Sequence, residues 1–339
     1  MGDTVYKVAV LGAGKRGTLH AKSHYENKRF EVVGLCDLDE ERLKTAAAVC
    51  GNPRTFINAA EMLEVTKPDI FVFATPPAIR LPLIKLGVEH GVKLISYEKP
   101  MSTNFAEAQE IMKICRDAEV KTVVSHQQKY GDHHQAVLKL VQSGELGKIK
   151  TIYAHCWGWY FHMVTHLIDY IRMYNNNEEA LWVSGAVSGR EKLFDNHPSP
   201  DYAGGFIQFA NGVRGIIETG ENAPDVPEME YNWHKGRFMI QGTDGFAEVF
   251  IGEGWKAVTK NGVLSGGGKF DYVHDQACYV DEIADWLDGK SVHSCNGESA
   301  FKGFEIAMAL LRSAAQRKII ALPLESGENE VEVLRSLLP

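Results

Sequence analysis

The sequence lacks the features that would tie the protein to a membrane, a nucleic acid or an oxidising compartment. No apolar run reaches the roughly 20 residues that a membrane span needs, and the N-terminus has no secretory leader pattern. Acidic residues outnumber basic ones, 44 to 36, so a phosphate backbone would be repelled. The six cysteines are scattered without a C-x-x-C pair, which indicates reduced thiols. We therefore expect a cytoplasmic protein without nucleic-acid or membrane partners.

The pattern of the first 125 residues is typical of an α/β domain. Short apolar runs such as YKVAVLG, FEVVGLCD, DIFVFATP, VKLISYE and VKTVVSH alternate with amphipathic stretches. Strands without polar alternation, each followed by a helix, predict a parallel sheet covered on both faces. Asp39 is expected to cap one helix at its N-terminus, and Gly91 to end another. A chain of 339 residues suits two domains, and we place the first at 1–125.

The pattern changes after residue 126, and we predict a second domain over 126–339. Glycine turns separate several β-like runs between residues 181 and 260, which favours a mostly antiparallel sheet. Helices are expected at 133–144, 161–174, 275–289 and 298–317. The glycine-rich segment 261–272 is expected to be a flexible surface loop. Together these features predict an α+β domain.

A glycine motif directly after the first strand predicts a dinucleotide-binding Rossmann domain. Gly12, Gly14 and Gly17 have G-x-G-x-x-G spacing between a strand and a helix. The first glycine permits the tight turn, the second lets the backbone approach a pyrophosphate, and the third lets helix and strand pack closely. The helix N-terminus then offers free N–H groups to the pyrophosphate.

The residues around this motif favour NAD and leave NADP open. Asp37 ends the second strand, 37 − 17 = 20 residues after the last glycine. A carboxylate there is expected to bind the ribose hydroxyls of NAD. Lys15 and Arg16, inside the loop, are the counter-evidence, because a basic pair suits the 2′-phosphate of NADP.

The sequence resembles the Gfo/Idh/MocA oxidoreductases. The motifs that carry the resemblance are the glycine loop, ATPP at 74–77, EKP at 98–100, GELGKI at 144–149, HLID at 166–169 and ALLRSAAQRKIIALP at 309–323. The resemblance implies a Rossmann domain, a C-terminal domain with an open sheet, and a sugar, cyclitol or related polyol as substrate. It also implies a nicotinamide cofactor, with Thr75 and Pro76 in its site, and a homodimer or homotetramer.

Lys99 is the leading catalytic candidate. It lies at the carboxyl end of a parallel strand, the edge where open α/β sheets bind ligands. Partial burial would lower its pKa towards the working range, so that it acts on the proton of a reacting hydroxyl. Glu98 is expected to orient Lys99 or to contact the nicotinamide ribose.

A second cluster lies in the segment WGWYFHMVTHLIDY. His162, His166 and Asp169 have spacings of four and three, so they share one helix face. We expect Asp169 to orient His166 as a proton acceptor and predict no bound metal, although the histidine pair leaves a metal site or a structural role open. The expected substrate contacts are Tyr130, Trp157, Trp159, Tyr160 and His162.

Two positions depart from the family pattern. His162 stands where the family usually has an aspartate, and Arg80 stands where many members have a histidine after TPP.

The leading hypothesis is an NAD(P)-dependent dehydrogenase or reductase acting on a secondary hydroxyl of a sugar, glycoside or cyclitol. A redox-neutral NAD-dependent glycosidase or lyase and a non-catalytic NAD-sensing protein stay open as alternatives.

Overall fold

The computed structural model describes residues 4–231 and 234–338 and divides into two compact units. The first contains Met1–Thr103, Glu107–Gln127 and Tyr272–Phe301, and the second contains Asn104–Ala106, Gln128–Asp271 and Lys302–Pro339. The segment 272–301 therefore packs with the first unit, whereas the sequence ranges placed it in the second domain.

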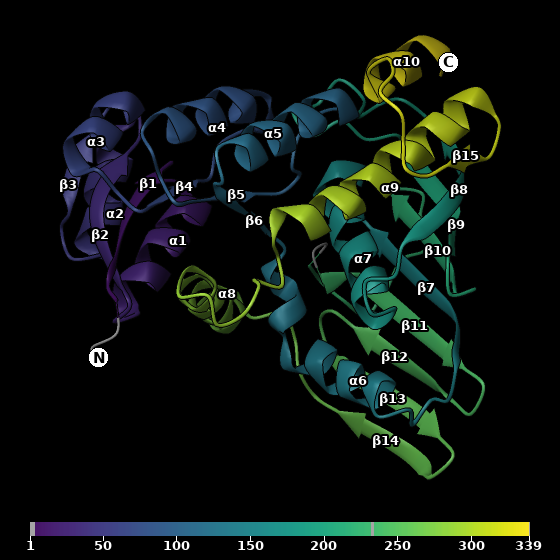
Figure 1. Ribbon diagram of the computed structural model, residues 1–339. Coiled ribbons are helices and arrows are strands. Elements are labelled where there is room, and N and C mark those ends of the chain that lie inside the picture. The colour runs from purple at the N-terminus through teal and green to yellow at the C-terminus, as the bar shows by residue number, and fades with distance from the viewer. Residues whose placement is uncertain (1–3, 232–233, 339) are drawn as a thin grey trace. The chain divides into compact units, whose positions relative to one another are not determined.

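The first unit is built on a six-stranded parallel sheet with the order β3-β2-β1-β4-β5-β6 (Figure 1). Its strands are β1 (Tyr6–Leu11), β2 (Phe30–Cys36), β3 (Arg54–Phe56), β4 (Ile70–Phe73), β5 (Leu94–Glu98) and β6 (Lys121–Ser125). This order reverses between β1 and β4, as in the doubly wound fold, whose ligands bind at the carboxyl ends of the strands near that reversal. Every residue of β4 is buried, which explains why the central strands are apolar throughout.

Helices follow the strands and cover both faces of this sheet. They are α1 (Lys15–Glu26), α2 (Glu40–Ala48), α3 (Ala59–Thr66), α4 (Arg80–Glu89), α5 (Phe105–Asp117) and the late helix α8 (Tyr272–Leu287), with a 3₁₀ turn η1 (Pro77–Ile79) before α4. The side chain of Asp39 accepts from the backbone N–H groups of Glu41 and Arg42, which confirms the predicted cap of α2. Gly91 has a φ of 69° directly after the C-cap of α4, as predicted for a helix stop.

The second unit is built on a nine-stranded sheet with the order β14-β13-β12-β11-β7-β10-β9-β8-β15. Its strands are β7 (Ile149–Trp157), β8 (Ala180–Ser188), β9 (Tyr202–Phe209), β10 (Arg214–Gly220), β11 (Gly236–Gly242), β12 (Phe246–Phe250), β13 (Gly254–Thr259), β14 (Gly262–Gly266) and β15 (Ile320–Ala321). All pairs are antiparallel except β7 with β10. The predicted fold class is confirmed. The prediction that 261–272 is a loop was wrong in part, because β14 pairs with β13 there.

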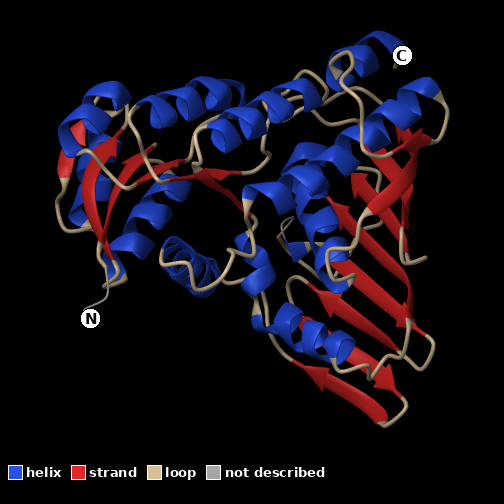
Figure 2. Cartoon of the chain, viewed as in Figure 1, coloured by secondary structure: helices blue, strands red, loops and turns tan. Residues whose placement is uncertain are grey.

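One face of the second sheet is covered by helices (Figure 2). The helices of this unit are α6 (Asp132–Gln142), α7 (Tyr160–Tyr174), α9 (Gly297–Gln316), which starts in the first unit, and α10 (Glu330–Leu337), with a 3₁₀ turn η2 (Gln127–Tyr130) before α6. Helix α7 packs on β7 and β10, and α6 on β12 and β13. Gly185 permits the close approach of α9 to β8, since a Cβ there would lie 2.2 Å from the carbonyl oxygen of Leu310. In the described part of the chain, no helix covers the other face (Figure 1).

Candidate active site

The glycine loop has the shape that a dinucleotide requires. Gly12 has a φ of 95°, and a Cβ on Gly17 would lie 1.6 Å from the carbonyl oxygen of Gly12, so both positions need glycine. An added Cβ on Gly14 would meet nothing within 4 Å, which leaves open space over the loop. Helix α1 begins directly after Gly14 without a side-chain cap, so its first N–H groups are available to a pyrophosphate.

Two polar groups extend this site along the sheet edge. The carboxylate of Asp37, at the end of β2, accepts from the backbone N–H of Ala13 at 2.6 Å and from that of Asp39 at 3.0 Å. The carboxylate therefore adjoins the glycine loop, as the ribose-binding acid of the fold does. At the end of β4, the hydroxyl oxygen of Thr75 is buried without a hydrogen-bond partner among the described residues. A buried polar group of this kind fits a site that a polar ligand completes.

The basic pair of the loop is engaged within the first unit. The guanidinium of Arg16 donates from Nε at 3.0 Å and from Nη2 at 2.8 Å to Oε1 of Glu98. The guanidinium also lies 5.1 Å from the ring centroid of Tyr272, and the ammonium of Lys15 lies 5.6 Å from the same centroid. Lys15 and Arg16 therefore have contacts of their own within the protein, which makes them weaker evidence for the 2′-phosphate of NADP. Asp37 remains the residue that favours NAD.

Glu98 lies at the centre of a buried polar network. His20, which is fully buried, has Nε2 at 3.0 Å from Oε1 of Glu98 and Nδ1 at 3.0 Å from Nε2 of Gln276. Burial alone would raise the pKa of Glu98, but the charge of Arg16 and the hydrogen bond of His20 hold that pKa far below its usual range. Glu98 is therefore a fixed negative charge directly beside Lys99.

The position and electrostatics of Lys99 suit a proton-transfer residue. Lys99 follows the last residue of β5, is half-buried, and is joined to Pro100 by a cis peptide bond. Burial lowers the pKa of its amine to about 8, with Glu98 opposing the shift and Arg16 and Arg80 adding to it. A pKa near the working pH is what a general acid or base requires.

The second unit contains its own buried polar cluster. The ammonium of Lys129 lies 2.9 Å from the carboxylate of Asp169, and both side chains are only 6% exposed. The next residue of α7, Tyr170, donates its hydroxyl to Gln128 at 3.0 Å. His166, on the same helix, is 3% exposed. Asp169 is thus the carboxylate partner of Lys129, and its role towards His166 stays a prediction.

The aromatic residues expected to contact substrate differ in burial and in hydrogen bonding. Tyr160 is 1% exposed and donates its hydroxyl to the carbonyl oxygen of Ala307, so it belongs to the core of the second unit rather than to a substrate platform. Trp159 donates from Nε1 to Glu221 at 2.8 Å, and its ring centroid lies 5.2 Å from that of His162.

Three further residues that are expected to contact the substrate, His162, Trp157 and Tyr130, are half-buried. His162 has its ring centroid 4.3 Å from that of His197. Trp157, at the end of β7, has the ammonium of Lys235 at 5.3 Å from its ring centroid. Tyr130 ends η2, directly after Lys129. His162 and Trp157 therefore lie in polar surroundings that suit hydroxyl-bearing ligands, and substrate roles for all three stay predictions.

Several functional candidates were missed from the sequence. His20 and Gln276 are 256 residues apart, and neither belongs to a recognisable motif. Lys129 was passed over in favour of its neighbour Tyr130, because the polar segment 126–129 gives no sign in the sequence that it is buried. Arg80 was noted only as a departure from the family pattern, yet it donates to the backbone carbonyls of Glu98 and Lys99.

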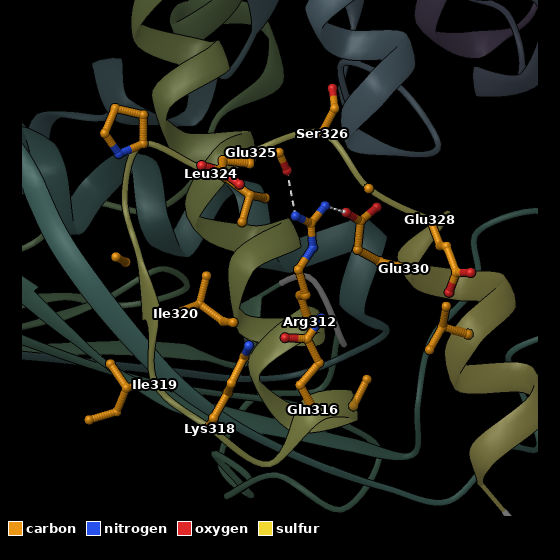
Figure 3. Close-up of a pocket in the computed structure, with 15 residues that line it drawn as sticks. Arg312, Gln316, Lys318, Ile319, Ile320, Leu324, Glu325, Ser326, Glu328 and Glu330 are labelled. Carbon is orange, nitrogen blue, oxygen red and sulfur yellow. Dashed lines mark hydrogen bonds and ion pairs between the residues drawn. The ribbon is translucent and has the colours of Figure 1, made fainter.

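A cavity away from these residues has a volume of about 620 Å³. It is lined by the end of α9, β15, the following loop and the start of α10 (Figure 3). Its wall includes Arg312, which donates to the carbonyl oxygen of Glu325 and pairs with the carboxylate of Glu330. None of the predicted site residues lines it.

Within 4–231 and 234–338, no helix is both long and apolar enough to cross a membrane. Over the same ranges, no three His, Cys, Asp or Glu side chains are grouped so that they could hold a metal ion.

A doubly wound sheet with a glycine loop, a carboxylate beside that loop and a lysine at the carboxyl edge is the arrangement of a dinucleotide-binding Rossmann domain. Residues 6–126 match the family described as an oxidoreductase family with an NAD-binding Rossmann fold, GFO_IDH_MocA. Over these residues the chain is similar to the Gfo/Idh/MocA oxidoreductases.

Individual relatives support this assignment. D-apiose dehydrogenase of Paraburkholderia graminis is 31% identical over 42% of this chain and 38% of its own length. Inositol 2-dehydrogenase of Rhizobium meliloti is 22% identical over 93% of this chain and 99% of its own length. The crystal structure of an oxidoreductase from Agrobacterium radiobacter, in complex with NAD⁺, L-tartaric acid and magnesium, is similar with a TM-score of 0.81. That similarity has 16% sequence identity and covers 93% of this chain and 98% of the other, and it shows the fold.

Proposed function

We propose that the protein is an NAD-dependent dehydrogenase or reductase that acts on a secondary hydroxyl of a sugar, glycoside or cyclitol. The observation that carries the proposal is the half-buried Lys99 beside the ionised Glu98, at the carboxyl edge of the sheet that holds the glycine loop. The names of the relatives, D-apiose dehydrogenase and inositol 2-dehydrogenase, support a polyol substrate.

The residues of the first unit are proposed to have separate roles in cofactor binding and proton transfer. The glycine loop and Asp37 hold the dinucleotide, and bound NAD supplies the acceptor for a hydride. The neutral amine of Lys99 accepts the proton of the reacting hydroxyl during oxidation, and its ammonium form returns a proton during reduction. Glu98 remains ionised and steadies the charged form of Lys99, while Arg16 and His20 hold the carboxylate in place.

We propose a substrate-binding role for the polar cluster of the second unit. His166 offers ring nitrogens to hydroxyl groups, and the Lys129–Asp169 pair fixes the helix turn that carries it. The half-buried His162, Trp157 and Tyr130 are proposed as further contacts with the polyol.

The rate of oxidation is expected to rise with pH and to level off above about pH 8. Burial lowers the pKa of Lys99 to about 8, so below that value most of the amine is protonated and cannot accept a proton. Reduction needs the ammonium, so its rate should fall as pH rises through the same value. Profiles of kcat/KM in both directions test this. An oxidation rate independent of pH between 6 and 9 would remove Lys99 from the role of base.

Asp37→Ala is expected to weaken NAD binding by roughly 10–100-fold, because hydrogen bonds to a charged group contribute about 1.5–3 kcal/mol. The affinity for NADP should fall less or rise, because the carboxylate that opposes a 2′-phosphate is gone. Titrations of protein fluorescence with each cofactor give both constants. Asp39→Ala changes an exposed carboxylate two residues further along the chain and serves as the neighbouring control. Equal losses for NAD and NADP would contradict the assigned contact.

The substrate proposal is tested by a panel of inositols, pentoses, hexoses and glycosides, each with NAD and with NADP. Both reduced cofactor and cleaved product are measured. One NADH formed per oxidised polyol supports the proposal. Cleavage without net NADH would instead favour a redox-neutral glycosidase or lyase, and NAD binding with no turnover of any compound would favour a sensing role.

We also propose a cytoplasmic homodimer or homotetramer formed through the sheet face that no described helix covers. Large and polar side chains share this face: the hydroxyls of Tyr153 and Tyr202 both donate to Glu218, and the rings of Trp182 and Phe206 stack with centroids 5.4 Å apart. The six cysteines are free thiols in the structure, which suits a reducing compartment. Light scattering of the purified protein gives the oligomeric state.

A further inference from the structure

The loop between β8 and β9 is fixed to the second unit at several points. Leu193 is 1% exposed, and Arg335 of α10 donates to its carbonyl oxygen from Nε at 2.9 Å and from Nη2 at 2.7 Å. Ser199 is also 1% exposed, and its hydroxyl accepts from the backbone N–H of Tyr160, the first residue of α7, at 2.7 Å. The backbone N–H of Ser199 donates to the carbonyl oxygen of Lys192 at 3.1 Å. The loop is therefore tied to the start of α7, with Lys192 in a defined position.

Two side chains of this loop meet predicted substrate residues at the start of α7. The ammonium of Lys192 lies 5.3 Å from the ring centroid of Trp159. The ring centroid of His197 lies 4.3 Å from that of His162, which in turn lies 5.2 Å from that of Trp159. All four residues are half-buried. An indole, two imidazoles and an ammonium thus form one partly exposed cluster from two separate segments of the chain.

The charge of Lys192 is the feature of this cluster that points to a ligand. Within the described part of the chain, Lys192 forms no ion pair with a carboxylate, whereas the buried Lys129 of the same unit is paired with Asp169. The contact with the face of Trp159 attracts the ammonium but leaves its charge uncompensated. Taking a cation partly out of water without a counter-charge costs stability. A ligand with a negative charge therefore fits this position.

Three carboxylates near the cluster hold other donors. Glu221 accepts from Nε1 of Trp159 at 2.8 Å. Asp195 accepts from the backbone N–H two residues further along the loop at 3.2 Å, and Asp201 accepts from another backbone N–H of the loop at 3.1 Å. These carboxylates support the indole and the loop backbone, so the cluster presents the ammonium and the two imidazoles to a ligand.

We propose that Lys192 and His197 are specificity-determining residues, which together with His162 bind an anionic group of the polyol substrate. The inference rests on the proposed function and narrows its substrate class to sugars that carry a carboxylate or phosphate group. An ammonium and imidazole N–H groups all donate to such a group. His166 lies one helical turn beyond His162, about 6 Å along the axis, which places the anionic group and a hydroxyl at His166 about one hexose apart.

The test compares pairs of sugars that differ only in the group at C6. The pairs are D-glucose with D-glucuronate, D-galactose with D-galacturonate, and D-glucose with D-glucose 6-phosphate. Calorimetric titration of the full-length protein, saturated with NADH so that no oxidation occurs, gives the dissociation constant of each compound. In wild type, the acidic member of at least one pair is expected to bind roughly tenfold tighter than its neutral partner, the effect of one hydrogen bond to a charged group. The preferred acidic member distinguishes a carboxylate from a phosphate.

Four variants separate the charge from the packing of the loop. Lys192→Met is expected to abolish the preference, with less than about a twofold change for the neutral member. His197→Leu should weaken binding of the acidic member by roughly fivefold, and Lys192→Arg, which keeps the charge, by less than about threefold. Lys260→Met makes the same change at an exposed lysine of the same unit and should alter no affinity. Lys192→Gln replaces Lys192→Met if the latter does not fold.

The outcomes separate this inference from the proposed function. Acidic members that bind no tighter than their neutral partners, or that do not bind, overturn the inference, and so does a preference that Lys192→Met retains. If neutral polyols are oxidised while no acidic sugar is preferred, the proposed function stands and the inference is wrong. If Lys192→Met removes a preference found in wild type, but no compound yields NADH with NAD, the proposed function fails and the anion-binding role of Lys192 stands.

Discussion

Lys99→Ala is expected to lower kcat by about 10²–10⁴-fold, the usual contribution of a general acid or base. Binding of NAD should change little, because the glycine loop and Asp37, at other strand ends, are the residues proposed to hold the dinucleotide. The loss should be greatest in the reaction that the polyol panel identifies, measured at pH 8 by formation of NADH. A loss in kcat with an unchanged dissociation constant for NAD would separate chemistry from binding.

Two variants serve as controls for this result. Lys93→Ala removes a lysine at the opposite end of the same strand, which is 61% exposed and paired with Asp69, and it should leave kcat unchanged. Lys99→Arg keeps a positive charge but cannot deprotonate at neutral pH, so it should be nearly as inactive as Lys99→Ala. Full activity in Lys99→Arg would show that charge alone, rather than proton transfer, is needed.

Asp169→Ala is expected to destabilise the second unit by about 3–5 kcal/mol, because it leaves the buried ammonium of Lys129 without its carboxylate. Unfolding in urea, followed by near-ultraviolet circular dichroism, measures the effect. Two compact units can unfold separately, so the transition of the second unit must be followed with its own probes.

A double variant separates the effect of losing the ion pair from the effect of leaving one buried charge unpaired. Lys129→Met with Asp169→Leu replaces both charges by apolar side chains, and it should recover most of the stability lost in Asp169→Ala. The double variant should still lose activity, because the pair is proposed to fix the turn that carries His166. An Asp169→Ala protein as stable as wild type would mean that Lys129 is not held by this carboxylate in solution.

Local sequence was sufficient for the glycine loop and for the strand ends that carry Asp37 and Lys99 in the first unit. The glycine loop, Asp37 and Lys99 each follow a strand directly, so their placement depends only on strand order and spacing, and the helix stop at Gly91 depends only on its own φ. The strand β3 has three residues and β14 is exposed and glycine-rich, so neither has the apolar run by which strands are recognised.

Contacts between distant segments were not accessible in this way. Gln276 belongs to α8, which packs on α1 although more than 200 residues of the chain lie between them. The buried partner of Asp169 is Lys129 on a separate turn, and no spacing rule connects residues that are 40 positions apart. Arg80 was visible as an unusual residue, but its hydrogen bonds to the carbonyl groups of Glu98 and Lys99 were not.

The central claim is that a hydride passes from a polyol carbon to NAD while Lys99 takes the hydroxyl proton. It is tested most directly with the best compound of the panel, deuterated at the carbon that carries the oxidised hydroxyl. We predict one deuterium in each NADH formed, detected by mass spectrometry, and loss of this transfer in Lys99→Ala. NADH without deuterium, or a cleaved product with no NADH, would contradict the claim.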